Sequence, residues 1–257
     1  MRRLHLMLSV ILGLGAASSG RLGRADELVS DTFEVQGVKI HYLEQGKGQP
    51  VLLIHGLYSS AEMNWKLPGI FAALAKDYRV VALDLPGHGQ SDKPQKEEAY
   101  GLQIVEDVTL LLDRLKIKKA HVVGYSMGGI VALKFVAEHP DRVSSCALGG
   151  MGWLRDGSGL QKVWERMPGG DTSRTPPAFV HSMAKLALSE EELRHVSVPV
   201  EVLVGDHDPM KRLYVEPLQR VRKDWPVVEI QDARHISCIM KKQFRDELAA
   251  WLKKQSK

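Results

Sequence analysis

The sequence predicts an α/β protein in which a mostly parallel sheet of about eight strands carries helices on both faces. Short runs of β-branched and apolar residues alternate with longer helix-like stretches along most of the chain. Such alternation is typical of parallel strands joined by right-handed crossover helices. The 257 residues, 44% of them hydrophobic, also suffice for the core of one domain of this kind.

The individual elements follow from the periodicity of the apolar residues. We expect a strand hairpin over residues 32–44 with its turn at Gly37. The strands predicted after it are 51–54, 80–83, 120–123, 143–148, 200–204 and 227–230. The predicted helices are 65–75, 104–116, 130–137, 213–222 and 243–253.

The first residues have the pattern of an export signal. A basic start, Met1-Arg2-Arg3, precedes a mostly apolar stretch over 4–17 and small residues over 16–20. This predicts a secretory signal peptide over about 1–25, cleaved near 18–20 or after Ala25, and a single domain over 26–257. We therefore expect a periplasmic or extracellular protein without stable membrane insertion. An uncleaved membrane anchor is the alternative, although the apolar run is shorter than the roughly 20 residues of a spanning helix.

The net charge of +4 gives no indication of nucleic acid binding. Residues 1–25 hold four arginines and no acid, so the remaining chain has as many basic as acidic residues. Two cysteines, Cys146 and Cys238, could pair in an oxidising compartment. Because one lies in a predicted central strand, we favour two free thiols.

A strong chemical signal is the segment Gly124-Tyr125-Ser126-Met127-Gly128. It follows the apolar run 120–123 and opens the helix predicted over 130–137. An abrupt turn from strand to helix strains the backbone at its tip and requires small neighbours, which explains the two glycines. The helix N-terminus also favours negative charge developing beside the serine hydroxyl. The pattern predicts that Ser126 is a nucleophile.

Other segments extend the pattern over most of the chain. They are His55-Gly56 after a predicted strand, the turn over 84–91, the segment 139–143, the loop 205–209 and the surroundings of His235. With the segment around Ser126, they resemble the compact, single-domain α/β-hydrolases from about residue 35 to 251. Residues 150–194 carry no motif that we can assign to that family. They are rich in glycine, proline and polar residues, and we expect a small lid there.

The resemblance implies a catalytic triad in the chain order serine, acid, histidine. Asp208 and His235 occupy the expected places after the last two strands. Asp206 competes with Asp208 because it lies in the same loop, and a turn-capping role is its alternative. The resemblance further implies that the backbone N–H groups of Leu57 and Met127 bind the oxyanion.

Several other residues near these motifs are interpreted as structural. His55 is expected to brace the oxyanion turn, and His207 to be a loop residue. Asp84, His88 and Ser91 are expected to shape the turn beside the site. The apolar residues of the predicted lid could line an acyl pocket or pack the lid onto the body, and both interpretations stay open; they are Trp153, Leu160, Val163, Trp164, Met167, Phe179, Met183 and Leu186.

These residues predict an exported serine hydrolase that cleaves a small carboxylic ester through an acyl-enzyme. Relatives with dehalogenase or epoxide hydrolase activity carry a carboxylate in place of Ser126, so those reactions are not expected. Thioesters, lactones, amides and carbon–carbon bonds of diketones are alternatives, as are perhydrolase or haloperoxidase side activities. A triad-bearing binding or receptor-like protein is a further alternative. No metal cluster, phosphate loop or dinucleotide motif is present in the sequence, so we expect no cofactor.

Overall fold

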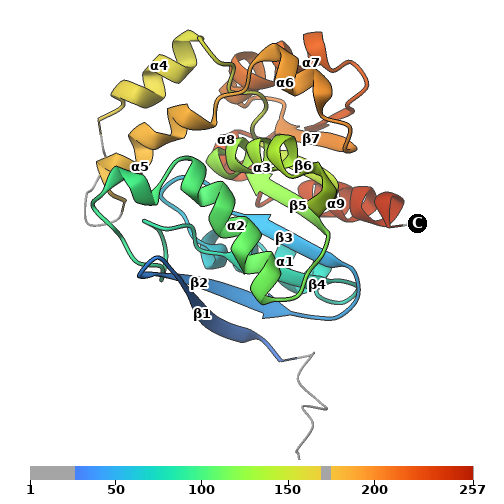
Figure 1. Cartoon of the computed structure of the whole chain (residues 1–257). Coiled ribbons are helices and arrows are strands. Elements are labelled where there is room, and N and C mark those ends of the chain that lie inside the picture. The colour runs from blue at the N-terminus through green and yellow to red at the C-terminus, as the bar shows by residue number, and fades with distance from the viewer. Residues whose placement is uncertain (1–26, 169–174, 257) are drawn as a thin grey trace, which may run out of the picture.

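The structure, a computed structural model, describes residues 27–168 and 175–256 (Figure 1). The segment predicted as a signal peptide lies outside the described residues. Among the helices that are described, none is long and apolar enough to cross a membrane.

The predicted sheet is confirmed, with eight strands in the order β1-β2-β4-β3-β5-β6-β7-β8. The hairpin β1–β2 is antiparallel, β2 pairs antiparallel with β4, and every later pairing is parallel. The strands are β1 (Val29–Val35), β2 (Val38–Gln45), β3 (Pro50–Ile54), β4 (Arg79–Leu83), β5 (Ala120–Tyr125), β6 (Val143–Gly149), β7 (Val200–Gly205) and β8 (Val227–Ile230). Their carboxyl ends meet at one edge of the sheet, where the loops of α/β folds hold their ligands.

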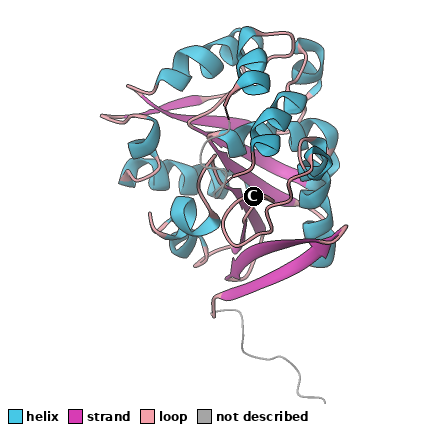
Figure 2. Cartoon of the chain, turned by 90° about the vertical axis from the view of Figure 1, so that its left-hand side faces the viewer, coloured by secondary structure: helices cyan, strands magenta, loops and turns pink. Residues whose placement is uncertain are grey.

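Helices cover both faces of the sheet, as Figure 2 shows. The α-helices are α1 (Ile70–Leu74), α2 (Leu102–Arg114), α3 (Met127–Glu138), α4 (Gly159–Arg166), α5 (Pro177–Ser182), α6 (Glu190–His195), α7 (Glu216–Val221), α8 (His235–Cys238) and α9 (Lys242–Gln255). Short helices of other types are η1 (Glu62–Lys66), η2 (Glu97–Ala99), η3 (Pro140–Arg142), η4 (Met183–Leu186) and η5 (Lys211–Val215).

The buried side chains form one core on each face. The helices α2 and α3 pack on one face together with the residues between β6 and β7. The segments η1, α1, α8 and α9 pack on the other face. Consecutive strand residues alternate between the two cores, as Leu52 and Leu53 of β3 do.

One predicted helix is wrong in its extent. Residues 65–75 do not form one helix, because the π-helix η1 ends at Lys66 and α1 begins at Ile70. Between them Gly69 has a φ of 75°, a left-handed conformation that an α-helix cannot continue through. The spacing of apolar residues on either side of Gly69 is compatible with one helix, so the sequence did not indicate this break.

Candidate active site

The segment around Ser126 is a sharp turn between β5 and α3. Ser126 is the single residue between Tyr125, which ends the strand, and Met127, which begins the helix. Its φ of 52° and ψ of −124° are strained for a residue with a side chain. A Cβ added at Gly124 would lie 2.1 Å from the Gly128 carbonyl oxygen, so only glycine fits there.

Gly128→Ala is expected to destabilise the fold, because the added Cβ would lie 2.3 Å from the backbone oxygen of Ile54. Since backbone must move to relieve this contact, we expect a loss of about 2 to 3 kcal/mol in the free energy of unfolding, measured in urea. Gly159→Ala is the control, because a Cβ at Gly159 meets nothing within 4 Å. Equal urea midpoints for the two variants would contradict the prediction.

The structure brings Ser126, His235 and Asp208 into one chain of hydrogen bonds. The Ser126 Oγ lies 2.8 Å from His235 Nε2, and His235 Nδ1 lies 2.8 Å from Asp208 Oδ2. Asp208 is 4% exposed, and its Oδ1 also accepts the Met210 N–H at 2.9 Å. A carboxylate that accepts from Nδ1–H leaves Nε2 free to accept the serine proton.

Asp206 has a different environment from Asp208. Its carboxylate accepts the backbone N–H groups of Ala233 at 2.9 Å and Asp232 at 3.0 Å, and contacts the exposed ring of His207. The hydrogen bond from Ala233 is the main cause that lowers the pKa of Asp206 to about 2. Asp206 thus caps the loop before His235, whereas Asp208 contacts the histidine.

Tyr125 holds the backbone of His235, a contact that the sequence analysis missed. Its hydroxyl donates a hydrogen bond to the His235 carbonyl oxygen, and the two ring centroids are 5.9 Å apart. Burial raises the pKa of the Tyr125 phenol above its usual range, so the hydroxyl keeps its proton. The residue stood inside the recognised motif, but its partner is 110 positions away in the sequence and no local pattern indicates it.

Tyr125→Phe is expected to lower kcat about five- to tenfold with little change in KM, since one buried hydrogen bond typically contributes about 1 kcal/mol. The ring remains, so the loss reports the placement of His235 rather than packing. Steady-state kinetics on a soluble ester measures it. A lower melting temperature with unchanged kcat would instead assign the hydroxyl to stability alone.

The predicted oxyanion groups lie beside Ser126. A Cβ built on Gly56 would lie 3.2 Å from the Ser126 Cβ, so the turn that carries Leu57 packs directly against the serine. Within the described residues, the N–H groups of Leu57 and Met127 donate no hydrogen bond. Both are therefore available as hydrogen-bond donors next to the serine.

Side chains from three segments fix this turn. Asn64 Oδ1 accepts the Gly56 N–H at 2.7 Å, and Asp84 Oδ1 accepts the Ala61 N–H at 2.7 Å. His55 Nδ1 contacts the Gly56 oxygen at 2.8 Å, while its Nε2 accepts the Leu85 N–H at 3.0 Å. Burial lowers the pKa of His55, which favours a neutral ring in this bracing position. Asn64 lies in η1, one residue before the start of the predicted helix 65–75, and the sequence analysis did not identify it.

Asp84, His88 and Ser91 shape the neighbouring turn. Asp84 Oδ2 accepts the Gln90 N–H at 2.9 Å and contacts His41 Nδ1 at 2.9 Å. The Ser91 hydroxyl donates to the Asp84 carbonyl oxygen at 2.6 Å. Burial lowers the pKa of His88 to about 3, so its ring is neutral. These contacts are structural in kind.

Residues 150–194 form an insertion between β6 and β7 that contains α4, α5, η4 and α6 (Figure 1). Most of its large apolar residues belong to the core on the α2–α3 face; they are Trp153, Trp164, Phe179, Met183 and Leu186, each 6% exposed or less. Leu160 and Met167 pack against that core while half-buried, and Val163 is 51% exposed. The packing interpretation therefore describes most of these residues.

The two cysteines are free and buried. Burial raises the pKa of the Cys146 thiol, and it is also the main cause that raises the pKa of Cys238 to about 12. Neither thiol is therefore a reactive thiolate at neutral pH.

One group of three side chains within the described residues could offer donor atoms to a metal ion, namely Glu106, Glu138 and His139. Both glutamates are exposed, and Lys134 Nζ lies 3.1 Å from Glu138 Oε1 and competes with any cation. The group joins α2 to the end of α3, away from the start of α3 where Ser126 lies.

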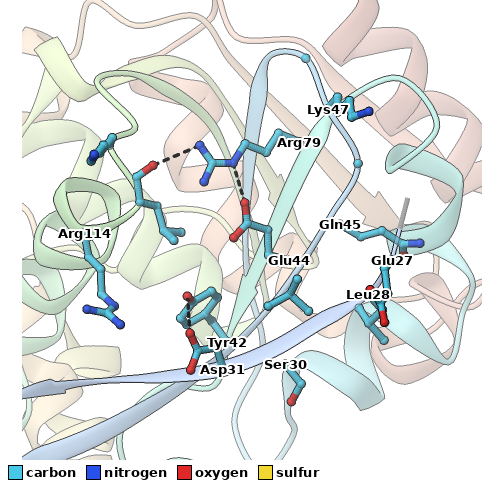
Figure 3. Close-up of a pocket in the computed structure, with 15 residues that line it drawn as sticks. Glu27, Leu28, Ser30, Asp31, Tyr42, Glu44, Gln45, Lys47, Arg79 and Arg114 are labelled. Atoms are coloured by element: carbon cyan, nitrogen blue, oxygen red, sulfur yellow. Dashed lines mark hydrogen bonds and ion pairs between the residues drawn. The ribbon is translucent and has the colours of Figure 1, made fainter. Parts of the chain in front are cut away.

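A large groove of about 1010 Å³ lies at another place in the fold (Figure 3). It is lined by the hairpin β1–β2, by Arg79 at the start of β4 and by the end of α2. Its charged side chains are partly paired, as Arg79 Nε donates to Glu44 Oε1 at 2.6 Å. Because the parallel strands begin here, the groove is at the opposite edge of the sheet from Ser126.

Comparisons with known proteins agree with this fold. The model of the alpha/beta hydrolase fold family matches residues 49–221, and the chain belongs to the α/β-hydrolase family. A dihydrolipoyllysine-residue acetyltransferase component of the acetoin cleaving system from Pseudomonas putida is 34% identical over 185 residues, 70% of this chain and 48% of that protein. A 2-hydroxy-6-oxo-6-phenylhexa-2,4-dienoate hydrolase from Comamonas testosteroni is 39% identical over 117 residues, 45% of this chain and 41% of that protein.

This chain thus spans less than half the length of these two relatives. Among solved structures, a membrane phospholipase A described as a bacterial virulence factor has a TM-score of 0.69 and 25% identity. That likeness covers 89% of this chain and 86% of the phospholipase chain.

Proposed function

We propose that this protein is a serine hydrolase that cleaves a small carboxylic ester through an acyl-enzyme on Ser126. The observation that carries the proposal is the chain of hydrogen bonds from Ser126 through His235 to Asp208. In this chain Ser126 is the residue with the strained backbone at the end of β5. A serine hydroxyl needs such a base to attack at neutral pH. The buried Asp208 orients that base and stabilises its protonated form.

Each residue has a defined part in the reaction. His235 Nε2 takes the proton of Ser126 Oγ while the oxygen attacks the ester carbonyl carbon. The N–H groups of Leu57 and Met127 stabilise the resulting oxyanion, and each such donor typically contributes about 10²- to 10³-fold in rate. His235 then gives the proton to the departing alcohol, and a water molecule activated by the same ring releases the acid from Ser126.

Carbon–carbon bond hydrolysis is the second candidate. It is supported by the likeness to the 2-hydroxy-6-oxo-6-phenylhexa-2,4-dienoate hydrolase, whose name describes a dienoate substrate. Ester cleavage is preferred because it requires only the proton transfers described above. A carbon leaving group would require a proton donor to carbon in addition.

The test is steady-state hydrolysis of p-nitrophenyl esters of increasing acyl length, beside a vinylogous diketone with a phenyl substituent. Many turnovers per molecule on the esters would support the proposal, and the preferred chain length would give the size of the acyl site. Turnover of the diketone alone would favour the second candidate. Tight binding with at most one turnover would favour the binding-protein alternative.

We also propose that the protein is exported, on the strength of the basic start and the apolar stretch over 4–17. Mass spectrometry of the protein recovered from a bacterial periplasm or culture medium tests this. An intact N-terminus on a protein retained in the cytoplasm would contradict export.

A further inference from the structure

Exposed apolar side chains stand on the segments that follow two parts of the candidate active site, the Leu57 turn and His235. Nine large hydrophobic residues of the described chain are exposed, and five of these come from two short segments. We define this set as the mouth patch: Tyr58, Met63 and Leu67 from the first segment, and Ile236 and Met240 from the second. Ile236 is 83% exposed although it directly follows His235, and Leu67 is 68% exposed. Clustered exposure of this kind marks an interaction site.

The two segments of the mouth patch lie on either side of Tyr125, next to Ser126. The Trp65 ring makes an edge contact with the Tyr125 ring at 6.5 Å, and the Tyr125 hydroxyl bonds the His235 backbone. Beneath the exposed residues, Trp65, Cys238 and Ile239 belong to one buried cluster. Arg245 Nη1 of α9 also donates to the Pro68 carbonyl oxygen at 3.1 Å, so the segment that ends at Leu67 is in direct contact with the helix that follows Met240.

Basic residues accompany the apolar ones. Arg234 stands two residues before Ile236 and Lys241 follows Met240, whereas Lys66, beside Leu67, is paired with Glu62 at 3.2 Å. Within the described ranges, Arg234 and Lys241 make no ion pair, so their charges are not neutralised by a neighbouring carboxylate. Long cationic side chains beside exposed apolar ones suit a boundary between anionic head groups and acyl chains.

We propose that the mouth patch docks the protein on an anionic lipid surface, with its apolar side chains at the head-group boundary and its cations near lipid phosphates. This presents Ser126 to the esters of that surface, so within the proposed ester hydrolysis the substrate class is a lipid carboxylic ester in place of a small soluble one. That substrate assignment rests on the proposed function, whereas the docking does not. A second copy of the chain fits the patch less well, because a two-fold contact would bring a second set of the same unpaired cations into one interface.

The experiment measures vesicle binding by sedimentation in a Ser126→Ala background, so that no lipid is consumed. One variant carries Ile236→Glu with Met240→Glu, and its control carries Leu102→Glu with Leu110→Glu. The control positions, on α2, are 45% and 42% exposed and lie on the other face of the sheet. A third variant, Arg234→Gln with Lys241→Gln, removes only charge. All proteins share one N-terminus, and the vesicles are phosphatidylcholine alone or mixed with phosphatidylglycerol.

We expect the mouth variant to bind mixed vesicles at least about tenfold more weakly than its parent, because two buried apolar contacts are lost and two negative charges added. The control should bind as the parent does. The charge variant should lose the preference for phosphatidylglycerol. Equal binding by the mouth and control variants overturns the docking, and so does a dimer on gel filtration that only the mouth variant breaks.

Soluble p-nitrophenyl ester hydrolysis in the Ser126 background separates this result from the proposed function. If vesicle binding depends on the patch but no ester is cleaved, the docking stands and the hydrolase proposal fails. If esters are cleaved and vesicle binding is independent of the patch, the hydrolase proposal stands and the docking proposal fails.

Discussion

Ser126→Ala and His235→Ala are each expected to lower kcat on a p-nitrophenyl ester by about 10⁴- to 10⁶-fold, and the double variant to lose little more. Nucleophile and base act as one unit, so once either is gone the other has no partner in the reaction. The 2.8 Å contact between Ser126 Oγ and His235 Nε2 is the structural reason for this coupling. Residual rate should come from the oxyanion donors and from substrate binding.

The diagnostic quantity is the kcat of the double variant, since losses of this size in the single variants could also follow from misfolding. Melting temperatures close to that of the parent protein would exclude unfolding as the cause. A double variant whose loss equals the product of the two single losses would mean that the residues act independently, and would remove the triad assignment.

Asp208→Asn is expected to lower kcat by about 10³- to 10⁴-fold, because an asparagine amide can hold the wrong tautomer of His235. Asp206→Asn should cost less than about tenfold in kcat, since Asp206 binds backbone N–H groups at 2.9 and 3.0 Å instead of the His235 ring. The two substitutions are chemically identical and two residues apart, so each is the matched control of the other. Kinetics on one soluble ester suffice.

Asp206→Asn should instead have a lower free energy of unfolding than the parent protein. This difference should be absent at the acidic limit and grow as the pH is raised. The folded-state pKa of Asp206 is depressed to about 2, so its carboxylate stabilises the fold above the unfolded pKa and loses that effect as pH falls through about 2. If Asp206→Asn proved the more damaging variant for kcat at neutral pH, the acid would have to be reassigned.

The strands were predictable from the sequence because their signal is local. Buried parallel strands such as 51–54 and 200–204 are continuous apolar runs, and the structure places them within a residue or two of the predicted bounds. The helix over 65–75 was not predictable in its extent, because a left-handed Gly69 interrupts an otherwise acceptable apolar spacing. The local spacing of apolar residues does not indicate a backbone conformation, such as that of Gly69, that tertiary packing selects.

The positions of Ser126, Asp208 and His235 could be predicted because chain order and motif spacing mark them. Their supports could not, since Tyr125 and Asn64 act through partners that no local pattern connects to them. The insertion over 150–194 was the least readable part. Residues such as Phe179 and Met183 have the composition of a pocket wall but are fully buried in the core, and composition alone does not separate the two roles.

The separation of 109 residues between Ser126 and His235 has a consequence for the protein as it is made. Synthesis at the usual rate leaves about 5 to 20 s during which the serine exists without its base. The Phe244 ring of α9 also packs edge-on against the Tyr125 ring, with 5.7 Å between the centroids. Tyr125, which holds His235, therefore gains part of its packing only when this later helix has been made. A nascent or truncated chain therefore carries a serine that lacks its hydrogen-bond partner His235, and the proposed triad is completed in one late step of assembly.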